Sequence, residues 1–332
     1  MKLEGKLFIH PMEVNEITLS NNIIHFHNHN NLEKGFMMKK EGIEGDDISF
    51  VLSKDDYKIL SGFNKMDISV KNNKINVRAG NIKLSLANMI DMKQNPHDFN
   101  DLKELNVDCC ILNDASKFTG VDKLKIMMEG VNVQSNRIIA SDSFLTYQSN
   151  LTEINEIDDF INIPKEVFNF TLMNENTKIK HNNKFIIVEY DDPIFDRIEY
   201  YSNLIALGIP KGVDIYQFTY EKSITFNTKD VINDLKLINK LDKYAVFFIE
   251  NNKMILSRKT DKSDISVDVQ AEIEGFDEKM HFGFNIEKFI KMISLVDEEN
   301  ITIHVNENNI CFDAKESKYR TFLLRTKIPG VD

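Results

Sequence analysis

The sequence lacks tryptophan and has little proline, glycine or cysteine: of 332 residues, 6 are Pro, 13 are Gly and 3 are Cys. So few Pro and Gly residues exclude a collagen-like repeat and argue against low-complexity linkers or disordered tails. The cysteines are Cys109, Cys110 and Cys311. An odd count with two adjacent members implies no disulfide framework, which fits a reducing cytosol.

Long apolar runs are also absent. No segment approaches the ~20 apolar residues that a membrane-spanning helix needs. The start, Met1 to Lys6, lacks the apolar stretch of a signal peptide. These features predict a soluble, cytoplasmic protein without a membrane partner. The apolar content of 42% is normal for a globular chain, and the length predicts roughly two or three domains.

Charge and motifs narrow the function classes. A net charge of −11 argues against a protein that grips phosphates over its whole surface, but not against one whose basic residues face one way. The sequence has no Gly-rich phosphate loop, no Gly-x-Ser-x-Gly and no His-Glu-x-x-His motif. Neighbouring acids such as Asp55 and Asp56 do not converge, so they are poor acid–base candidates. We therefore expect no catalytic residues and no enzyme.

The strongest internal signal is a repeat. An Asn-containing turn lies between alternating apolar segments at six places, which start at residues 19, 70, 133, 180, 249 and 305. Asn tolerates the left-handed backbone angles of tight turns, and the flanking alternation is typical of β-hairpins. The first, third and fifth copies are 114 and 116 residues apart, and the other three are 110 and 125 apart. This spacing predicts three units of about 110 residues, each with two hairpin modules.

Helix-like segments precede five of the six hairpins: Ser53–Phe63, Asn113–Met128, Pro164–Met173, Thr228–Leu241 and Ile286–Val296. Ser53, Thr228 and Asn285 are suitable N-caps, and Pro164 suits a first turn. Only Leu3 to Val14, interrupted by Pro11, precede the first hairpin, so its helix is missing or vestigial. Helices on one side of antiparallel sheets predict an α+β fold. The expected domains are 1–104, lacking its leading helix, 105–211 and 212–332.

Several segments carry a resemblance to a known family. They are Arg137-Ile138-Ile139-Ala140-Ser141-Asp142-Ser143, Ile163-Pro164-Lys165, Ser202-Asn203-Leu204-Ile205, Gly208-Ile209-Pro210 and Met280-His281-Phe282-Gly283-Phe284-Asn285-Ile286. In their order and spacing the chain resembles the bacterial DNA polymerase III beta subunit, the DNA sliding clamp. Ser143 stands where that family usually has Gly, and Pro329 lies later than the family's C-terminal Pro. The departures, and the Asn, Lys and Ile usage of an AT-rich genome, are compatible with a divergent phage- or plasmid-encoded member.

The resemblance implies three like domains per subunit and a ring of two subunits joined head to tail. Such a homodimer would encircle double-stranded DNA without reading its sequence and would tether a replicative DNA polymerase. A clamp loader would be a further partner, and no metal or cofactor is implied. Two alternatives stay open: a nucleotide-processing enzyme on a repeated α+β scaffold, and a structural or interaction scaffold.

A ring of this kind needs a mildly positive inner wall. The five helix segments carry +3 while the chain carries −11, which leaves −14 for the remainder. The candidate DNA-binding residues are Lys117, Lys123, Lys125, Lys229, Lys236, Lys240, Lys288 and Lys291. Lys is also a good helix former on solvated faces, and that role is an equal alternative for each of them.

The resemblance further implies an apolar groove, between the middle and last domains, for short peptides from polymerases and clamp loaders. The matching positions are Leu124, Ser141, Phe144, Leu145, Pro210, Leu323 and Leu324. An apolar groove with a few polar groups suits a peptide. Buried leucine is also the usual core residue, so a purely structural role stays open at each position.

One pattern stands apart from the resemblance. His25, His27 and His29 alternate, so they share one face of a strand. Such a face can bind a metal ion, but the strand alone supplies no fourth ligand. We therefore predict a polar, exposed strand face.

Overall fold

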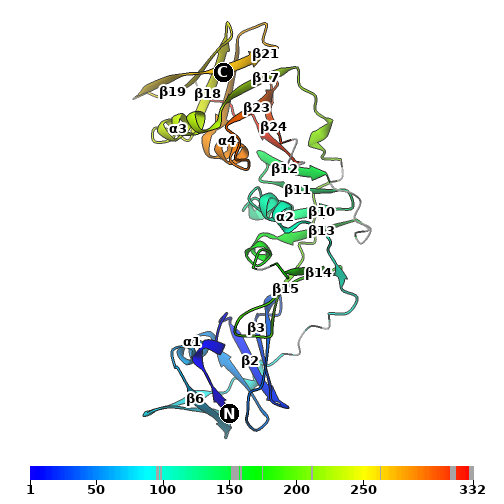
Figure 1. The fold of residues 1–332 in the computed structure, drawn as a ribbon, viewed down its shortest axis with the longest axis vertical. Coiled ribbons are helices and arrows are strands. Elements are labelled where there is room, and N and C mark those ends of the chain that lie inside the picture. Colours follow the sequence, from blue (N-terminus) through cyan, green and yellow to red (C-terminus); the bar gives the residue numbers. More distant parts are fainter. Residues whose placement is uncertain are drawn as a thin grey trace. The chain divides into compact units, whose positions relative to one another are not determined.

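The computed structural model describes residues 1–94, 97, 99–150, 157, 159–173, 175–210, 212–261, 263–314 and 319–328. The chain forms two compact units (Figure 1). The first unit comprises Met1–Cys110 and Ile163–Ala206, and the second comprises Ile111–Asn162 and Leu207–Asp332. The middle third of the chain therefore contributes to both units. None of the helices within the described ranges is long and apolar enough to cross a membrane.

The first unit is built on two antiparallel sheets. The larger has the order β5 (Ile48–Ser53), β2 (Val14–Ser20), β3 (Ile23–Asn30), β4 (Lys34–Glu41), β16 (Arg197–Asn203), β15 (Phe185–Tyr190), β14 (Lys178–His181) and β9 (Lys103–Glu104). The smaller has the order β1 (Lys2–Leu3), β6 (Met66–Lys71), β7 (Lys74–Ala79) and β8 (Ile82–Ala87). The helical elements are α1 (Lys54–Ser61), η1 (Gly5–Leu7), η2 (Ile90–Met92) and η4 (Lys165–Asn169). In the larger sheet, β4 pairs with β16, so the sheet joins strands that are distant in the sequence.

The second unit repeats this plan. Its larger sheet has the order β13 (Phe160–Pro164), β10 (Gly130–Gln134), β11 (Arg137–Ser141), β12 (Leu145–Asn150), β25 (Tyr319–Leu324), β24 (Asn309–Ala314), β23 (Asn300–Val305), β17 (Lys222–Asn227) and β21 (Ala271–Glu274). Its smaller sheet has the order β20 (Asp264–Val269), β19 (Lys253–Lys259), β18 (Tyr244–Glu250) and β22 (Met280–Asn285). The helical elements are α2 (Cys109–Ser116), α3 (Thr228–Ile238), α4 (Ile286–Ile293), η3 (Lys123–Met128) and η5 (Ile215–Gln217).

All six predicted hairpins are confirmed. Their strands pair in antiparallel register as β2–β3, β6–β7, β10–β11, β14–β15, β18–β19 and β23–β24. Three turns place two consecutive asparagines in the left-handed region, with φ between 50° and 63°: Asn21-Asn22, Asn72-Asn73 and Asn251-Asn252. In two others, the side chains of Asn182 and Asn306 accept hydrogen bonds from backbone N–H groups two and three residues later. The same residue type thus serves two different kinds of turn.

Three of the predicted helices are confirmed as α-helices. The Ser53 side chain caps α1 by accepting from the Asp56 N–H at 3.2 Å, and Asn285 caps α4 by accepting from the Lys288 N–H at 3.0 Å. The predicted cap of α3 is wrong by one position, because Asn227, not Thr228, accepts from the Asp230 N–H at 3.1 Å. These caps fix where each helix starts.

The other two helix predictions are wrong in their bounds. The segment predicted as Asn113–Met128 divides into α2, which ends at Ser116, and the 3₁₀ helix η3. The Gly120 N–H donates to the Met128 carbonyl at 2.6 Å, so the chain folds back after Gly120 and cannot continue as one α-helix from Asn113 to Met128. Of the segment predicted as Pro164–Met173, only Lys165–Asn169 is helical, again as 3₁₀. Asn, Phe and Thr residues in that segment are weak helix formers.

The core of the second unit explains why α3 and α4 form. Along α4 the buried residues are Ile286, Phe289, Met292 and Ile293, which follow the helical period. The Phe289 ring packs on the rings of Phe247 and Phe284, with centroids 5.2 and 4.8 Å away. The two helices contact each other and lie beside the strands of this unit (Figure 1). Burial of each of these apolar side chains stabilises the fold by about 1.5–3 kcal/mol, and it leaves the polar face of each helix in contact with solvent.

Candidate partner site and lysine positions

The turn between β11 and β12 is held by one carboxylate. Asp142 Oδ1 accepts hydrogen bonds from the backbone N–H groups of Phe144 at 3.0 Å and Leu145 at 2.9 Å. The Asp142 N–H in turn donates to the Leu145 carbonyl at 3.1 Å. This arrangement fixes the backbone on both sides of Phe144, so the turn determines where that side chain leaves the backbone.

Ser143 occupies the strained position of this turn, with φ of +81°. The left-handed backbone explains why a glycine would suit this position, as the resemblance implied. Ser143 compensates with its hydroxyl, which donates to Met128 Sδ at 3.0 Å and accepts from Lys125 Nζ at 2.9 Å. Both partners belong to η3, so the serine links η3 to the turn.

Lys288 connects α4 to the same turn. Its Nζ donates to Asp142 Oδ2 and lies 5.0 Å from the centroid of the Phe144 ring. The Asp142 and Lys288 side chains are both less than one-third exposed, so this pair is screened less than a surface ion pair. One turn along α4, Lys291 Nζ lies 5.2 Å from the centroid of the buried Phe118 ring. The sequence argument missed Asp142 as a member of the site, although an Asp two residues before a fixed aromatic is typical of an Asx turn.

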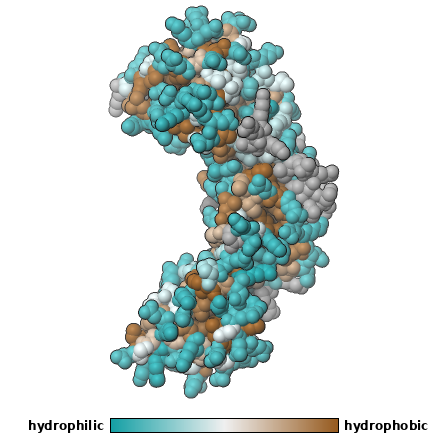
Figure 2. Space-filling model, in the orientation of Figure 1, coloured by the Kyte–Doolittle hydropathy of each residue, from teal (hydrophilic) through white to brown (hydrophobic). Residues whose placement is uncertain are grey.

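Large apolar side chains are exposed around this turn. Phe144 is 52% exposed and Leu124, on η3, is 93% exposed, with Val121 and Ile126 also exposed nearby in the sequence. Exposed apolar residues occur in both units, and Figure 2 shows hydrophobic surface among hydrophilic residues on each. Exposure alone therefore does not identify a site, whereas exposure beside an immobilised turn gives a rigid apolar surface.

Three of the predicted groove residues lie on paired strands. Leu145 on β12 pairs with Leu323 on β25, and both are buried. Leu324 is half-buried, and its N–H donates to the Phe144 carbonyl at 2.8 Å. The structure thus brings β25 directly against the turn, and it places Leu145 and Leu323 in the core beneath the exposed Phe144.

The two remaining groove residues lie at different places. Ser141 is buried and its hydroxyl hydrogen-bonds to that of Thr146 at 2.9 Å across β11 and β12. Pro210 is exposed and follows Ile209, whose carbonyl accepts from the Gln134 side chain at 3.1 Å. Ser141 therefore belongs to the turn, whereas Pro210 follows a segment held against β10.

The predicted lysines fall into two groups by environment. Lys229, Lys236 and Lys240, from α3 and the residues after it, are exposed. Lys125, Lys288 and Lys291 contact the turn or Phe118 as given above, and Lys117 forms an ion pair with Asp114 at 2.6 Å. The side chain of Lys123 lies outside the described part of the structure. Among the predicted lysines whose side chains the structure describes, Lys229, Lys236 and Lys240 are exposed and make no hydrogen bond or ion pair to a described residue.

The predicted exposed histidine face on β3 is wrong in part. His25 is exposed, but His29 is fully buried and His27 is half-buried. Residues distant in the sequence, among them Tyr201 and the segment at Gln94, lie over the buried end of this face. Glu16 from the neighbouring strand β2 joins His27 and His29 there. Among the described residues, Glu16, His27 and His29 form a group of metal-binding residue types whose side chains are close enough to share one ion.

Comparisons with known proteins identify the fold. No protein-family model matches the chain, and no curated protein matches it in sequence. The DNA polymerase III beta subunit of Pseudomonas aeruginosa matches with a TM-score of 0.82 and 11% identity, covering 99% of this chain and 100% of that chain. The Helicobacter pylori beta clamp bound to a DNA ligase peptide matches with a TM-score of 0.80 and 13% identity, covering 98% and 99%.

A third example is the DNA polymerase III beta subunit of Thermotoga maritima, with a TM-score of 0.75 and 16% identity over 96% of this chain and 93% of that chain. Such low identity with nearly complete coverage shows the fold. The chain has the fold of the bacterial DNA polymerase III beta subunits, and the expected α+β class of repeated clamp-type domains is confirmed.

Proposed function

We propose that this chain is a DNA sliding clamp subunit, which encircles double-stranded DNA and tethers a replicative DNA polymerase. The observation that carries the proposal is the match of nearly the whole chain to beta subunits with TM-scores of 0.75–0.82. A partial match would be explained by one shared domain, whereas this match covers 99% of the chain and so includes all six hairpin modules. Its role is structural, with no catalytic residues and no chemistry on the DNA.

The proposed domains are 1–104, 105–211 and 212–332. Strand pairing supports this division, because each range contains two of the six hairpins. The small sheet β1-β6-β7-β8 lies in the first range and the small sheet β20-β19-β18-β22 in the last. The larger sheets join neighbouring ranges through the pairs β4–β16 and β12–β25. Each domain is thus two modules, one in each of two sheets.

The DNA-facing surface is proposed to carry the lysines that follow α2, those of η3, those of α3 and just after it, and those of α4: Lys117, Lys123, Lys125, Lys229, Lys236, Lys240, Lys288 and Lys291. The exposed Lys236 and Lys240 are the strongest candidates, because neither ammonium group makes a hydrogen bond or ion pair to a described residue, so both can contact phosphate. A few such contacts suit a clamp that slides, since each phosphate contact adds a counterion-release contribution that would slow movement. The clamp loader and the polymerase would then supply directionality.

The partner-peptide site is proposed at the turn that holds Phe144. Support comes from the exposed apolar side chains of Phe144 and Leu124 and from the anchoring of that turn by Asp142 and Lys288. The Helicobacter pylori beta clamp, which shares this fold, is bound to a DNA ligase peptide. An exposed aromatic on a fixed backbone binds an apolar side chain at low entropic cost, because little ordering is needed.

Ring closure is proposed to use two sheet edges. In the described part of the chain, β8 pairs only with β7 and β20 only with β19, so each strand has one unpaired edge. Exposed Lys83 lies on β8, whereas exposed Asp264 and Asp268 lie on β20. Unpaired edges of opposite charge suit pairing between two copies, β8 of one with β20 of the other, which gives a head-to-tail homodimer.

A topological experiment tests the proposed function. The labelled chain is assembled on closed circular plasmid and separated from free protein by gel filtration, after which the plasmid is cut once. A clamp stays with the circle and leaves the linear DNA by sliding off its ends. Equal retention on circular and linear DNA, or a monomeric mass at every concentration, would reject the proposal.

A further inference from the structure

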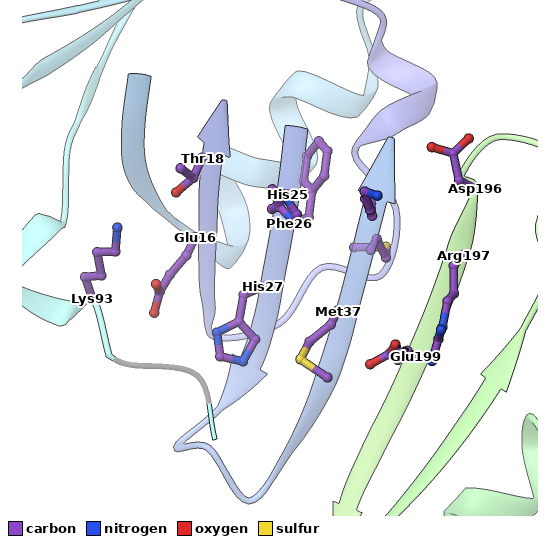
Figure 3. Close-up of a pocket in the computed structure, with 12 residues that line it drawn as sticks. Glu16, Thr18, His25, Phe26, His27, Met37, Lys93, Asp196, Arg197 and Glu199 are labelled. Atoms are coloured by element: carbon purple, nitrogen blue, oxygen red, sulfur yellow. Dashed lines mark ion pairs between the residues drawn. The ribbon is translucent and has the colours of Figure 1, made fainter. Parts of the chain in front are cut away.

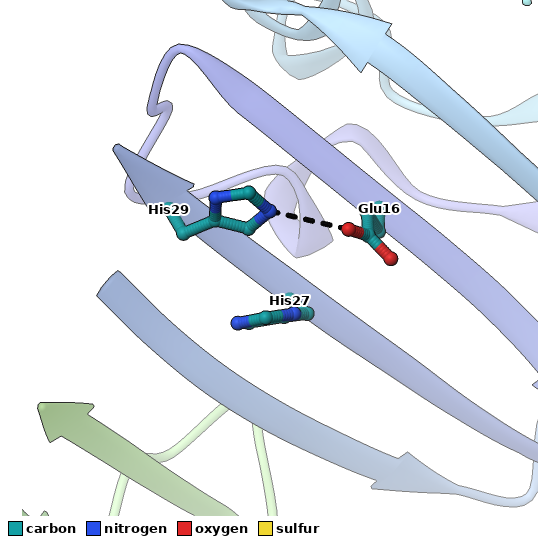
Figure 4. Close-up of side chains that lie close together, drawn as sticks. All are labelled: Glu16, His27 and His29. Carbon is teal, nitrogen blue, oxygen red and sulfur yellow. Dashed lines mark hydrogen bonds and ion pairs between the residues drawn. The ribbon is translucent and has the colours of Figure 1, made fainter. Parts of the chain in front are cut away.

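The cluster of Glu16, His27 and His29 is set by strand register. On the antiparallel pair β2–β3, Glu16 lies opposite His27 and Val14 lies opposite His29. Side chains at alternate positions share a face, so His29, His27 and Glu16 project to the same side of the sheet. Figure 4 shows the two imidazoles and the carboxylate gathered at one point between these strands.

The three side chains are close enough to share one ion. His29 Nε2 lies 3.1 Å from Glu16 Oε1, and the centroids of the two imidazole rings are 4.6 Å apart. One ligand atom from each residue lies within 4.8 Å of the other two. Zinc binds nitrogen and oxygen ligands at about 2.0–2.2 Å, so ligand atoms in a zinc site are about 3–3.5 Å apart. The distance between Glu16 Oε1 and His29 Nε2 already has this value. A small movement of the His27 ring toward these two atoms would bring all three ligand atoms to the spacing of a zinc site.

The cluster is buried and its outer hydrogen bonds are already made. Glu16 is 5% exposed and His29 is fully buried. Glu16 Oε1 accepts from the Gln94 N–H at 2.8 Å, and His27 Nε2 hydrogen-bonds to the Tyr201 hydroxyl at 2.9 Å. Outer partners of this kind orient the ligands of metal sites. They leave His27 Nδ1 as the nitrogen available to an ion.

Two buried nitrogens in this cluster have no hydrogen-bond partner among the described residues. They are His27 Nδ1 and His29 Nδ1, and neither contacts solvent. A buried polar atom without a partner is costly, and native structures usually pair such atoms or place an ion or water beside them. A bound cation would satisfy His27 Nδ1 directly. It would also take the place of the proton that lies between His29 Nε2 and Glu16 Oε1, and that proton would move to His29 Nδ1 or to water.

An adjacent cavity of about 640 Å³ gives access to the cluster. Glu16 and His27 line its wall together with Lys93, Arg197 and Glu199 (Figure 3). A cavity of this size holds water, which can supply a fourth ligand that the strands do not provide. The missing fourth protein ligand is therefore no obstacle to binding.

We propose that Glu16, His27 and His29 form a binding site for one divalent transition-metal ion of the zinc class, with water from the cavity as fourth ligand. Two imidazoles and one carboxylate select zinc and its neighbours over magnesium or calcium, which prefer six or more oxygen ligands. The ion links β2 to β3 and stabilises the first unit. The site is independent of DNA and of the peptide surface, which lies in the other unit.

Zinc titration of the full chain, purified in chelator and then freed of it, tests this site. We expect one Zn²⁺ per chain and a higher thermal midpoint with Zn²⁺. His27→Gln removes a ligand and should weaken binding at least about 100-fold, since loss of an outer partner alone costs about 10- to 100-fold. Tyr201→Phe removes such an outer partner and should weaken binding about 10-fold. His281→Gln, on β22 in the second unit, should leave the affinity unchanged.

A second measurement keeps the test decisive if His27→Gln fails to fold. X-ray absorption of the zinc-loaded wild-type chain should show a first shell of two imidazoles with oxygen ligands. A first shell without imidazole, a stoichiometry well below one, or equal affinity of the His27→Gln and wild-type chains would overturn the proposal. Weak binding that no substitution changes would indicate an adventitious surface ion only, which also overturns it.

Discussion

Phe144 offers a quantitative test of the proposed peptide site, because it is half exposed on a backbone held by other residues. A phenylalanine side chain can bury about 150–250 Å², and 52% exposure leaves about 100 Å² available to a partner. At about 25 cal/mol per Å², its complete burial contributes about 2.5 kcal/mol. Alanine keeps only the Cβ portion, so Phe144→Ala should weaken an apolar peptide by about 2 kcal/mol, or roughly 30-fold.

The assay is fluorescence anisotropy with a labelled apolar peptide from the replicative polymerase of the same genome. The variant should fold normally, because the hydrogen bonds that fix the turn use the backbone of Phe144 and the side chain of Asp142. Ile59→Ala is the matched control, since Ile59 is 46% exposed on α1 of the other unit. Equal affinities for Phe144→Ala and the wild-type chain, or an equal loss with Ile59→Ala, would refute the placement. Leu323→Asp is a poorer test, because Leu323 is buried and a charge there would disrupt the sheet.

Three further predictions address other parts of the chain. Lys236→Glu with Lys240→Glu should shorten retention on circular DNA without changing the thermal midpoint, whereas Lys253→Glu with Lys259→Glu, the same charge change at two exposed positions of β19, should leave retention unchanged. Burial raises the pKa of Glu199 more than Arg197 lowers it, so its ionised form is disfavoured in the folded state. Glu199→Gln should therefore raise the thermal midpoint at neutral pH, and the gain should shrink as the pH falls and Glu199 protonates; an unchanged gain would contradict this. Asn252 has φ of +58°, so Asn252→Val should destabilise the chain by about 1–2 kcal/mol in denaturant unfolding, and no loss would reject the turn assignment.

The hairpins were predictable because their signal is local. Asn72-Asn73 and Asn251-Asn252 adopt the left-handed angles that their side chains tolerate, and nothing distant is needed to form the turn. The pairs β4–β16 and β12–β25 were not predictable in the same way, because any alternating strand is a suitable neighbour for any other. The assembly of modules into sheets is therefore decided by packing that the local pattern does not contain.

The candidate sites show the same contrast between what the local sequence predicts and what the packing of distant segments decides. The resemblance put Leu145 and Leu323 in one set of groove residues, and the structure pairs them across β12 and β25. Residue type could not say that both are buried while Phe144 is exposed. The alternation of His27 and His29 predicted a shared face, but not that Tyr201 and Gln94 would cover it. Burial depends on segments brought from elsewhere in the chain, and these decide whether a polar strand face is solvated or becomes a site.

The pairing of β12 with β25 and of β16 with β4 has a consequence for how the chain can be divided. If residues 105–211 were expressed as a fragment, both strands would lose a neighbour at once. β12 has six residues and β16 has seven, so each would present a full row of unsatisfied backbone N–H and C=O groups to other molecules. Such a fragment should self-associate instead of remaining monomeric. The sequence repeat alone suggests that each domain could fold independently, but truncation at the proposed boundaries would expose strand edges that bind other copies.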